Sequence, residues 1–574
     1  MFGRKAKIVV TMGPALETEE KIKEAILAGA DAFRLNFSHG SHEEHYKRFT
    51  LVRKVSEELG EYIPVIQDIQ GPKIRIKEIE GGQCELKDGD TVVLSSKGDV
   101  GDCHILYVDY PYLENDLKPG ASVFIDDGKI KLRVTQNTKE GVVCEVVAGG
   151  IVKPHKGVNI VGVNLTIPSV TEKDKKDVLF GIKMGVDYIA QSFVRSPDDV
   201  MDLRNFLVLN GGKNIGIIAK IEKYEAVENL ESIILVADAV LIARGDLGVE
   251  VPIEEVPVIQ KKIIKMARKY AKPVITATQM LESMISSPMP TRAEATDVAN
   301  AIFDGTDAVM LSAETSVGKY PIETIKTMSR IIKRAEKALK NGEVPYYEKI
   351  MPMAGFTDAI GLATCELANT TSAKAIITST ESGRTAKLVA KYKPQAYIVA
   401  ASPREETLRK LGIVWGTYPL YIPPFSSVDA LLSSIIDEAG AKGYLESGDV
   451  AVITAGDFVG VEGTTNLIKI ATYTPVIARG IGIGSGFIVG RITHGETDGE
   501  VLVVDDIASI EQVDGHVKVI LVKKKDFGVS ANIPAGMPMV IGVGDAIDTL
   551  KDGDLVSVDV YRGIVYGGQI IRTG

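Results

Sequence analysis

Two acidic and two basic residues stand at the ends of short apolar runs in the first part of the chain. Lys220 and Glu222 end one run two residues apart, on the same face of an extended strand, and Asp246 follows the next run. Paired carboxylates without His or Cys favour Mg²⁺ or Mn²⁺ over zinc. Lys220, Arg34 and such a metal would suit a phosphoryl group, whose charge spreads over its oxygens during transfer. The alternative is an ion pair between Glu222 and Arg244.

Other polar side chains follow apolar runs as well. Thr278 carries a hydroxyl that could bind a carboxylate or help relay a proton, with water sharing the task because Thr is a poor base. Asn36, Ser38 and Asp68 offer oxygen atoms that suit a monovalent cation or the counterion of a bound phosphate, and a solvated network is the alternative. His39, at a predicted helix start, is more typical of a cap or a nucleotide contact than of a catalyst.

The elements that position these side chains repeat one unit, an apolar run followed by a helix-like stretch. Continuous apolar runs are typical of parallel strands buried on both faces, and eight such units close a (β/α)8 TIM barrel, whose active site lies at the C-terminal ends of the strands. The glycines of segment 244–248 would let backbone amides approach a small anion closely, and a helix is predicted to start near Ile253. The eight runs are residues 8–11, 32–36, 64–68, 188–191, 215–220, 240–244, 273–278 and 308–312.

Changes in this repeating pattern of apolar runs and helix-like stretches predict four domains. Residues 1–70 and 164–340 form the barrel, and residues 71–163, rich in short strand-like runs and Gly or Asp turns, form an inserted β-rich lid. Helical patterning resumes at Thr171, a predicted N-cap. Residues 341–473 alternate again and predict an open α/β domain, and residues 474–574 predict a small extra C-terminal domain of mixed or β structure.

Composition narrows the class of protein. The chain has 574 residues and a formal net charge of −10, which argues against nucleic acid or an anionic membrane as the main partner. Its four cysteines lie far apart without CxxC spacing, so we expect neither a disulfide framework nor a zinc cluster, and we expect a cytoplasmic location. The N-terminus lacks the pattern of a signal peptide, and no run is long enough to span a bilayer.

Six motifs in this order closely resemble those of the pyruvate kinases. The resemblance covers roughly residues 1 to 473 and agrees with the division into domains above. It implies transfer of a phosphoryl group from phosphoenolpyruvate to ADP, followed by protonation of enolpyruvate to pyruvate. The motifs are RLNFSHG (34–40), DIQGPKIR (68–75), AKIE (219–222), ARGDLG (243–248), TQMLESM (278–284) and PTRAE (290–294).

The resemblance also implies roles for individual residues. Glu222 and Asp246 would hold Mg²⁺, Lys220 and Arg34 would act on the transferring phosphoryl group, and Thr278 would bind the substrate carboxylate near the path of protonation. The remaining roles implied are substrate binding at Gly245, catalysis at Ser312, a potassium site at Asn36, Ser38, Asp68 and the Ile69 carbonyl, and nucleotide contacts at Asn36, His39, Arg75 and Lys156. A second Mg²⁺ would arrive with the ADP or ATP, and the family implies a homotetramer.

Two positions depart from the family pattern. Members that need potassium carry Glu where this chain has Lys73, and Thr where it has Ile69. A tethered ammonium could supply the charge of the ion, so we expect activity that is largely independent of K⁺. The alternative is that Lys73 is an ordinary surface charge of the lid.

The last two domains carry weaker motifs. Thr380, Ser382, Gly383, Arg384 and Thr385 form a small-polar loop before a predicted helix, and such a loop suits a phosphate. It resembles the family's effector loop, as segment 460–466 also does, which predicts activation by a sugar phosphate or a nucleoside monophosphate; a plain helix cap is the alternative.

The tail resembles the swivelling phosphohistidine domain attached to some bacterial pyruvate kinases. The Thr-Ser-His-Ala motif of that domain is absent, and Ser530-Ala531-Asn532-Ile533 stands near its expected place. We therefore expect a structural or interfacial tail without phosphohistidine.

Three other functions could use some of the same residues. A metal-dependent C–C lyase or mutase on a similar barrel could use paired carboxylates and an Arg, but it has no use for Arg75 and Lys156 of the lid. A phosphometabolite sensor that had lost catalysis would show damaged rim residues, and none is damaged. Phosphotransfer through histidine lacks its motif in the tail.

Overall fold

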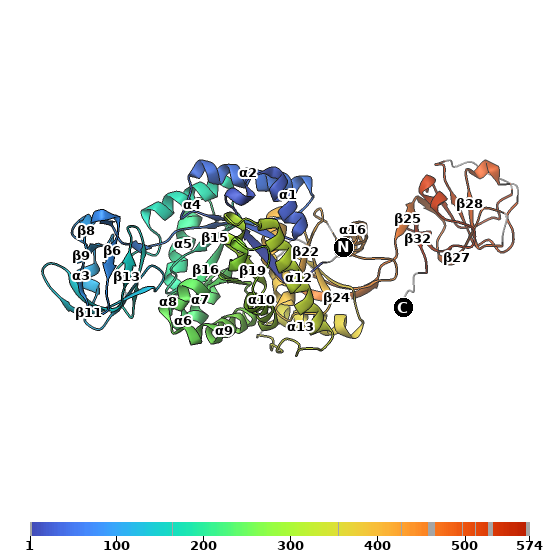
Figure 1. Cartoon of the computed structure of the whole chain (residues 1–574). Coiled ribbons are helices and arrows are strands. Elements are labelled where there is room, and N and C mark those ends of the chain that lie inside the picture. Colours follow the sequence, from blue (N-terminus) through green and yellow to red (C-terminus); the bar gives the residue numbers. More distant parts are fainter. Residues whose placement is uncertain are drawn as a thin grey trace.

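The computed structural model describes residues 3–569 apart from 164, 354, 426, 457–464, 496–497, 511 and 526–531. Four bodies follow one another along the molecule (Figure 1). A β-rich lid lies at one end and is followed by a barrel ringed by helices, an α/β layer structure and a separate sheet near the C-terminus. The predicted fold class is confirmed for the barrel, the inserted β structure and the α/β sheet. The exact domain limits stay predictions.

The barrel closes through eight parallel strands, in the order β1-β19-β18-β17-β16-β15-β3-β2. Each of the eight apolar runs named above contributes one strand. The strands are β1 (Lys7–Thr11), β2 (Ala32–Asn36), β3 (Val65–Asp68), β15 (Tyr188–Gln191), β16 (Gly216–Ile221), β17 (Ala239–Ala243), β18 (Val274–Ala277) and β19 (Ala308–Leu311).

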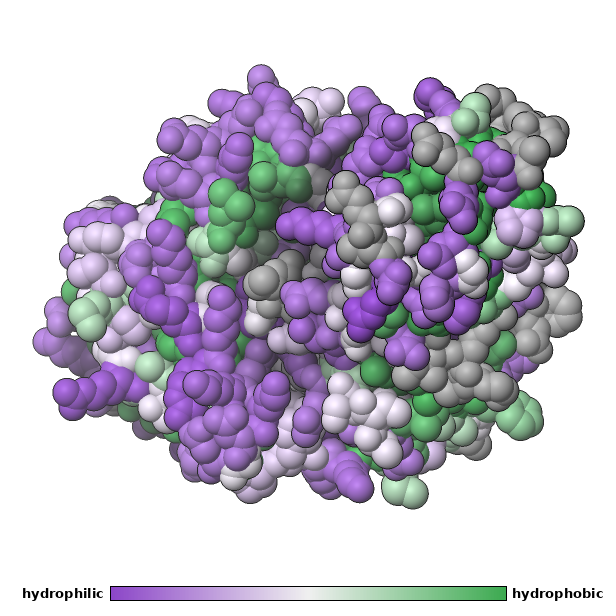
Figure 2. Space-filling view, turned by 90° about the vertical axis from the view of Figure 1, so that its right-hand side faces the viewer, coloured by the Kyte–Doolittle hydropathy of each residue, from purple (hydrophilic) through white to green (hydrophobic). Residues whose placement is uncertain are grey.

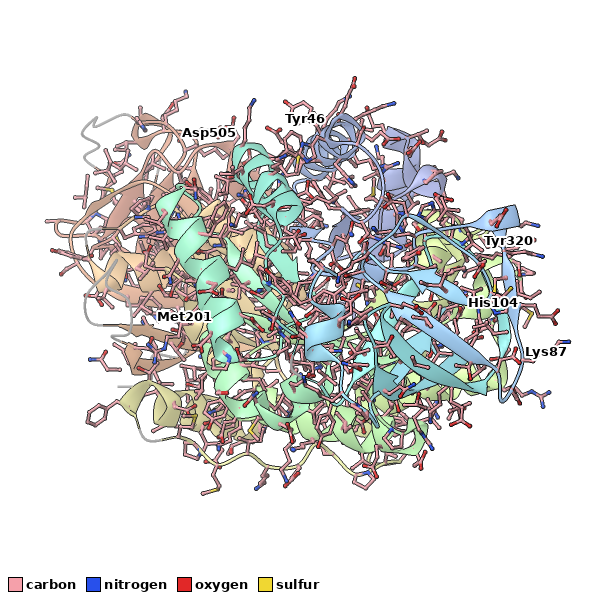
Figure 3. The ribbon with its side chains drawn as sticks, turned by 90° about the vertical axis from the view of Figure 1, so that its left-hand side faces the viewer. Tyr46, Lys87, His104, Met201, Tyr320 and Asp505 are labelled. Carbon is pink, nitrogen blue, oxygen red and sulfur yellow. The ribbon has the colours of Figure 1, made fainter. Side chains whose placement is uncertain are left out.

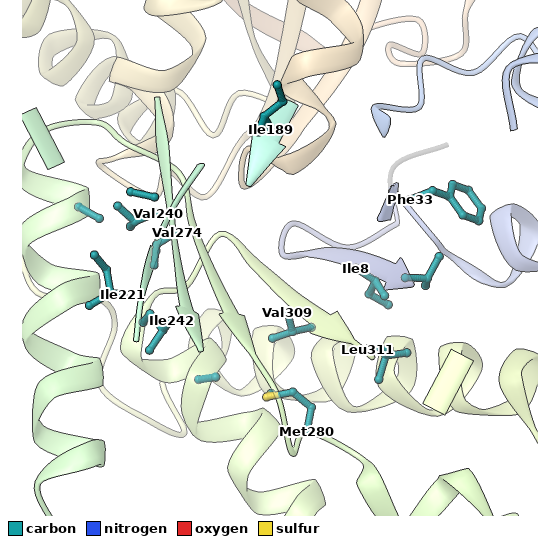
Figure 4. Close-up of a cluster of buried hydrophobic side chains, with 14 of the residues drawn as sticks. Ile8, Phe33, Ile189, Ile221, Val240, Ile242, Val274, Met280, Val309 and Leu311 are labelled. Atoms are coloured by element: carbon teal, nitrogen blue, oxygen red, sulfur yellow. The ribbon is translucent and has the colours of Figure 1, made fainter. Parts of the chain in front are cut away.

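Apolar residues on both faces of these strands explain the barrel. In β17, Val240 and Ile242 pack in the layer between the strands and the helices, whereas Leu241 packs inside the barrel. Figure 4 shows part of the outer layer, in which Val240, Ile242 and their neighbours from other strands face the surrounding helices. Both faces of these strands are therefore buried, and neither face contacts solvent.

Helices cover the outside of the barrel, and their starts follow ordinary capping rules. The predicted N-cap at Thr171 is confirmed, because its side chain accepts from the Asp174 amide in a capping box. The helices are α1 (Glu19–Ala28), α2 (His42–Glu58), α4 (Glu172–Met184), α5 (Pro197–Leu209), α6 (Tyr224–Glu228), α7 (Leu230–Val236), α8 (Arg244–Glu250), α9 (Val256–Lys269), α10 (Arg292–Asp304), α11 (Ala313–Ser316) and α12 (Pro321–Lys340).

The prediction that a helix begins only near Ile253 is wrong, because residues 244–248 are already helical. Strand β17 runs directly into α8, and residues 253–255 form only a short 3-10 helix before α9. Gly245 and Asp246 therefore lie in the first turn of a helix. This compact connection holds both residues close to the end of the strand.

The lid is inserted after β3 and contains a seven-stranded sheet with two small two-stranded sheets. Figure 3 looks on to this end of the molecule, with Lys87 and His104 on the lid. Its elements are β4 (Ile74–Arg75), β5 (Glu78–Ile79), β6 (Cys84–Leu86), β7 (Thr91–Ser95), β8 (Val100–Gly101), β9 (Ile105–Tyr107), α3 (Leu113–Asp116), β10 (Ser122–Ile125), β11 (Ile130–Asn137), β12 (Val142–Ala148), β13 (Gly150–Val152) and β14 (Gly157–Val161).

The α/β part has a five-stranded sheet in the order β22-β21-β20-β23-β24, parallel except for the edge strand β24. The sheet is sandwiched between two hydrophobic clusters. Its elements are α13 (Phe356–Thr370), β20 (Ala375–Ser379), α14 (Arg384–Ala390), β21 (Tyr397–Ser402), α15 (Glu405–Lys410), β22 (Thr417–Tyr421), α16 (Val428–Ala441), β23 (Val450–Gly456) and β24 (Thr465–Thr472).

The α/β part docks on the end of the barrel opposite the C-terminal ends of the strands. Ile413, in a short 3-10 helix after α15, is fully buried in the same cluster as the inward residues of the barrel strands. The Tyr188 hydroxyl, at the start of β15, donates to the Lys410 carbonyl (2.9 Å). Arg409 pairs with Asp187 at 2.9 Å, and buried Lys393 pairs with Asp307 at 3.0 Å. The floor of the barrel is thus completed by another part of the chain.

The C-terminal sheet has eight strands, in the order β25-β32-β31-β27-β28-β29-β30-β26. Arg479 links it to Asp437 of α16 at 2.8 Å, and Figure 2 views the molecule from this end, where hydrophobic and hydrophilic groups intermingle. The strands are β25 (Val476–Arg479), β26 (Ile481–Ile483), β27 (Phe487–Thr493), β28 (Val501–Val504), β29 (Val519–Val522), β30 (Met539–Ile541), β31 (Leu555–Asp559) and β32 (Ile564–Gly567).

The predicted likeness of this sheet to a swivelling domain stays a prediction. Ser530 and Ala531 lie outside the described residues. His494 is paired with Asp552 (Nδ1 to Oδ1, 2.6 Å). Among the helices that the structure describes, none is both long and apolar enough to cross a bilayer.

Candidate active site

The predicted rim residues gather because parallel strands end at the same edge of the barrel. Asn36 is level with Asp68 on the neighbouring strand, and Arg34 is level with Ile66. Lys220 lies in β16, and Glu222 directly follows that strand. Asp246 lies in the first turn of α8, while Thr278 and Ser312 follow β18 and β19.

A chain of alternating charges forms the centre of the site. Arg34 Nε donates to Asp68 Oδ2 at 2.6 Å, and Lys220 Nζ lies 3.5 Å from Asp68 Oδ1. Lys220 Nζ also lies 3.3 Å from Glu222 Oε2. The two carboxylates are 1–2% exposed and the two cations 12–13% exposed, so water screens these charges little.

The pKa shifts show how the cluster keeps its charges. Burial alone would raise the pKa of Asp68, but Arg34 and Lys220 outweigh it and the net shift is downward. Burial alone would lower the pKa of Lys220, but Asp68, Glu222 and Asp246 reverse the shift and raise it. Lys220 is therefore a fixed ammonium and Asp68 a fixed carboxylate.

Glu222 is the member of the cluster whose charge is least satisfied. Burial, and then the charge of Asp246, raise its pKa to about 7 against the opposing effect of Lys220. Its Oε1 accepts from the Phe193 amide at 2.7 Å, but its Oε2 is buried without a hydrogen-bond partner, although the Lys220 ammonium lies 3.3 Å away. An orphaned carboxylate oxygen close to a second carboxylate is a good fit for a divalent cation.

The protein offers this cation few ligands. Within the described part of the chain, no group of three or more His, Cys, Asp or Glu residues could enclose a metal ion. Mg²⁺ is commonly held by one or two carboxylates, with water and substrate phosphate completing the shell. Glu222 and Asp246 match that open arrangement.

The alternative ion pair between Glu222 and Arg244 is absent. Arg244 instead pairs with Asp297 (Nη1 to Oδ2, 2.7 Å) and donates through Nη2 to the Thr278 carbonyl at 2.7 Å. Thr278 has φ +66° and Gln279 has φ +53°, a conformation that costs about 1–3 kcal/mol for a residue other than glycine. Buried Arg244 holds this strained turn.

The strained turn directs the Thr278 hydroxyl to the start of α8. Its Oγ1 accepts from the Gly245 amide at 2.9 Å and lies 2.6 Å from the Ala277 carbonyl, to which it donates. Ser312 follows the neighbouring strand β19, just before α11, and its amide donates to Glu314 Oε2 at 2.7 Å. The predicted pair Gly245 and Thr278 is thus in direct contact.

The predicted monovalent-cation residues form two small groups. The Ser38 amide donates to Asn36 Oδ1 at 3.2 Å, and the Ile69 carbonyl accepts from the Ser192 hydroxyl at 2.7 Å. The Asp68 carboxylate faces Arg34 and Lys220, as described above. The end of the Lys73 side chain lies beside Gly157, the first residue of β14, where an added Cβ would come within 2.8 Å of the Lys73 Cε.

The predicted nucleotide residues lie on the lid and on the second βα loop. Arg75 Nη1 donates to the His155 carbonyl at 3.0 Å, and Lys156 pairs with Asp126 at 2.7 Å. The His39 carbonyl lies 2.9 Å from His45 Nε2. Both lid cations are therefore held by partners within the lid.

The lid meets the barrel through a buried ion pair. Lys223 Nζ lies 2.7 Å from Glu250 Oε1, and Asn159 of the lid donates to the same carboxylate at 3.1 Å. Arg195 donates to the Leu165 and Ile167 carbonyls, each at 3.0 Å, in the segment that returns from the lid to the barrel. These contacts hold the lid beside the rim.

The predicted effector residues are brought together across the α/β sheet. Gly383, with φ +79°, precedes α14, and its amide donates to Thr380 Oγ1 at 3.0 Å. Thr385 Oγ1 lies 2.9 Å from Thr465 Oγ1, although the two residues are 80 positions apart in sequence. Ser382 and Arg384 are exposed beside this contact. Residues 460–464 of the second predicted segment lie outside the described residues.

Sequence reasoning missed two contributors to the rim. The Ser192 hydroxyl lies 2.7 Å from Lys220 Nζ and 3.4 Å from Asp68 Oδ1, and the Phe193 amide holds Glu222. Ser192 follows Gln191, the last residue of β15. The rule that found the other rim residues, a polar side chain directly after an apolar run, could have found Ser192 too.

Comparison with known proteins identifies relatives of this chain. The family model described as "Pyruvate kinase, barrel domain" matches residues 3–325, and "Pyruvate kinase, alpha/beta domain" matches residues 358–471. A pyruvate kinase of Geobacillus stearothermophilus is 42% identical over 582 residues, covering 99% of each chain. Pyruvate kinase 2 of Synechocystis is 39% identical over 583 residues, covering 99% of this chain and 98% of the relative.

A solved structure agrees with these relatives. The crystal structure of a pyruvate kinase from Cryptosporidium parvum matches with a TM-score of 0.76 at 35% sequence identity. The match covers 82% of this chain and 96% of that structure.

Replacing Glu222 with Gln should weaken Mn²⁺ binding at least tenfold, about 1.4 kcal/mol, because one of the two carboxylates is lost. Electron paramagnetic resonance of free Mn²⁺ measures the affinity without any assay of activity. Glu228→Gln, at an exposed position of α6, is the matched control and should bind Mn²⁺ like the wild type. Equal affinities of Glu222→Gln and the wild type would contradict the site.

Proposed function

Because this chain belongs to the pyruvate kinase family and is a phosphotransferase, we propose that its rim cluster transfers the phosphoryl group of phosphoenolpyruvate to ADP, giving pyruvate and ATP in glycolysis. The observation that carries this proposal is the buried series Arg34–Asp68–Lys220–Glu222, which keeps two cations charged beside an unsatisfied carboxylate. A site of this kind stabilises a migrating anion in a volume with little water.

Lys220 and Arg34 act on the phosphoryl group. Lys220 has three donors and its neighbours keep it protonated, so it can follow the charge that develops on the equatorial oxygens. Arg34 is oriented by Asp68 and by Thr11 Oγ1 at 3.1 Å, which leaves part of its guanidinium for a phosphoryl oxygen. Ser192 fixes the position of the Lys220 ammonium.

Glu222 and Asp246 hold the divalent cation, Mg²⁺ or Mn²⁺. When bound, such an ion neutralises phosphoryl and enolate oxygens as a Lewis acid. Glu222 presents its free Oε2 for this purpose, while the Phe193 amide fixes its other oxygen.

Thr278 and Gly245 bind the carboxylate end of the substrate. The Gly245 amide donates to the Thr278 hydroxyl at the start of α8, and in this proposal the substrate carboxylate takes the place of that contact. Enolpyruvate must then take a proton on carbon, and Thr278 and Ser312 share this transfer with water. The strained turn at Thr278 supports such a role, because strain of this kind gathers at functional sites.

ADP binds between the rim and the lid. Arg75 and Lys156 supply positive charge from the lid, and His39 and Asn36 contact the nucleotide from the barrel side. A second Mg²⁺ travels with the nucleotide. The enzyme works as a cytoplasmic homotetramer, as the family resemblance implies.

Replacing Lys220 with Met should lower kcat by about 10²–10³-fold, because the variant loses the positive charge beside the migrating phosphoryl group. A lactate dehydrogenase-coupled assay with phosphoenolpyruvate and ADP measures the rate, and a separate measurement of ATP excludes a lyase. Lys176→Met, at an exposed position of α4, should keep the wild-type rate. A Lys220→Met variant with wild-type turnover would refute the proposed role.

Lys73 replaces potassium in this proposal, while Ile69 removes a hydroxyl from the same region. Rates in Na⁺, K⁺ or tetramethylammonium should therefore agree for the wild type, and Lys73→Glu should become K⁺-stimulated. Lys87→Glu, an exposed charge reversal on the lid (Figure 3), should stay indifferent to K⁺. Strong stimulation of the wild type by K⁺ alone would disprove the replacement.

The loop of Thr380–Thr385 binds a phosphorylated activator, either a sugar phosphate or a nucleoside monophosphate. The hydroxyls of Thr380 and Thr385 are engaged within the fold, whereas Ser382 and Arg384 are exposed for a ligand. Arg384→Ala should abolish activation and spare basal turnover, as measured across a panel of sugar phosphates and nucleoside monophosphates. An unchanged response would count against the loop.

A further inference from the structure

Two cysteines of the lid lie side by side, although they are well separated in the sequence. Cys84 begins β6, and Cys103 lies between β8 and β9. Both are free thiols, and the two thiols interact directly. Neither belongs to the rim cluster or to the loop 380–385. The lid therefore carries a thiol pair for which the proposed phosphoryl transfer has no use.

Backbone pairing brings these two cysteines together. Strand β5 runs parallel to β8, with Ile79 level with Gly101. The chain leaves β5 through a short 3-10 turn and reaches Cys84, while Cys103 comes shortly after Gly101. Cys84 is then held by the antiparallel pairing of β6 with β13, in which it is level with Val152. Strand pairing therefore fixes the backbone near both thiols.

The turn that carries Cys103 is held as well. Asp102 Oδ1 accepts from the amides of His104 at 2.7 Å and Ile105 at 2.9 Å. Figure 3 shows His104, the next residue along the chain, on the lid. Groups that a fold holds beside each other react as an intramolecular pair, with a large gain in effective concentration.

The two thiols differ in their access to solvent. Cys103 is exposed, whereas Cys84 is 2% exposed and packs in the hydrophobic cluster of the lid. Burial, and then the neighbouring Cys103, raise the pKa of the Cys84 thiol to about 12. A reagent from solution therefore reacts at Cys103 first, and Cys84 reacts afterwards with the modified Cys103.

We propose that Cys84 and Cys103 form a reversible redox pair, which a hydroperoxide oxidises to a disulfide within the lid. The Cys103 thiolate attacks one oxygen of the hydroperoxide and the O–O bond breaks, which leaves a sulfenic acid on Cys103. The departing alkoxide, or hydroxide where the oxidant is hydrogen peroxide, takes up the proton that Cys103 had lost.

The second step forms the disulfide. The Cys84 sulfur attacks the Cys103 sulfur, the S–O bond breaks, and the Cys84 proton leaves with the oxygen as water. Two thiols thus lose two electrons, and the hydroperoxide gains them. A dithiol reductant reverses the change by thiol–disulfide exchange.

The aromatic disulfide DTNB tests the pair in the folded full-length protein, because each exchange releases one coloured thiol. The wild type should release two per chain, the first as Cys103 forms a mixed disulfide and the second as Cys84 displaces the reagent from Cys103. Mass spectrometry of the intact chain should then show the loss of two hydrogen atoms and no bound reagent. A wild-type chain that keeps the reagent on Cys103 would overturn the proposal.

Variants assign the two steps. Cys84→Ala should release one coloured thiol and keep the reagent, and Cys103→Ala should release almost none, because the remaining cysteines are buried. Cys365→Ala, in α13 of the α/β part, is the matched control and should behave like the wild type. Circular dichroism checks that each variant is folded. Two coloured thiols from Cys84→Ala would show that another cysteine supplies the second, against the proposed pair.

Hydrogen peroxide tests the oxidation itself. The treated wild type, alkylated and digested, should yield two peptides joined through Cys84 and Cys103, which dithiothreitol separates. Cys84→Ala should instead accumulate sulfinic or sulfonic acid at Cys103, since no second thiol intercepts the sulfenic acid. The same over-oxidised Cys103 in the wild type, with Cys84 still reduced, would refute the redox pair. None of these measurements needs turnover, so they are independent of the proposed reaction.

Discussion

Mutual neutralisation of buried charges is the constraint on which the rest of this molecule depends. Removing a lone ion from water costs several kcal/mol, so Asp68 and Lys220 stay charged at the rim because each lies beside opposite charge. This pairing needs β2, β3 and β16 to end at one level, which only a closed barrel of aligned strands ensures. The negative charge of Glu222 is only partly compensated, because its Oε2 has no hydrogen-bond partner. This oxygen is therefore available to bind a cation.

Rigid support surrounds this cluster. Arg244 holds the turn at Thr278, Ser192 holds the Lys220 ammonium, and the Phe193 amide holds Glu222. Each supporting contact is made from a neighbouring strand end or loop, so the groups that would touch a substrate need not rearrange before the reaction. Preorganisation of this kind is a large share of what enzymes contribute to catalysis.

Much of this was predictable from sequence, for definite physical reasons. Strands buried on both faces must be apolar throughout, so the runs revealed the barrel, and polar residues such as Lys220 and Asp68 at their ends revealed the rim. Partners fixed by tertiary contacts were not predictable. Arg244 pairs with Asp297 and donates to the carbonyl of Thr278, which has a left-handed conformation. Thr385 contacts Thr465, which lies 80 positions away in the sequence. No local pattern encodes either contact.

Part of the barrel interior is filled by Ile413, which lies outside the strands and helices of the barrel. Its side chain fills the bottom layer from outside the strand-and-helix repeat, beneath residues such as Ile66 and Ile218. A fragment ending after α12 would expose that layer to water and leave a hole where the side chain had been. The barrel and the α/β part are therefore expected to stabilise each other, and a barrel excised without Ile413 should be less stable than the barrel of the whole chain.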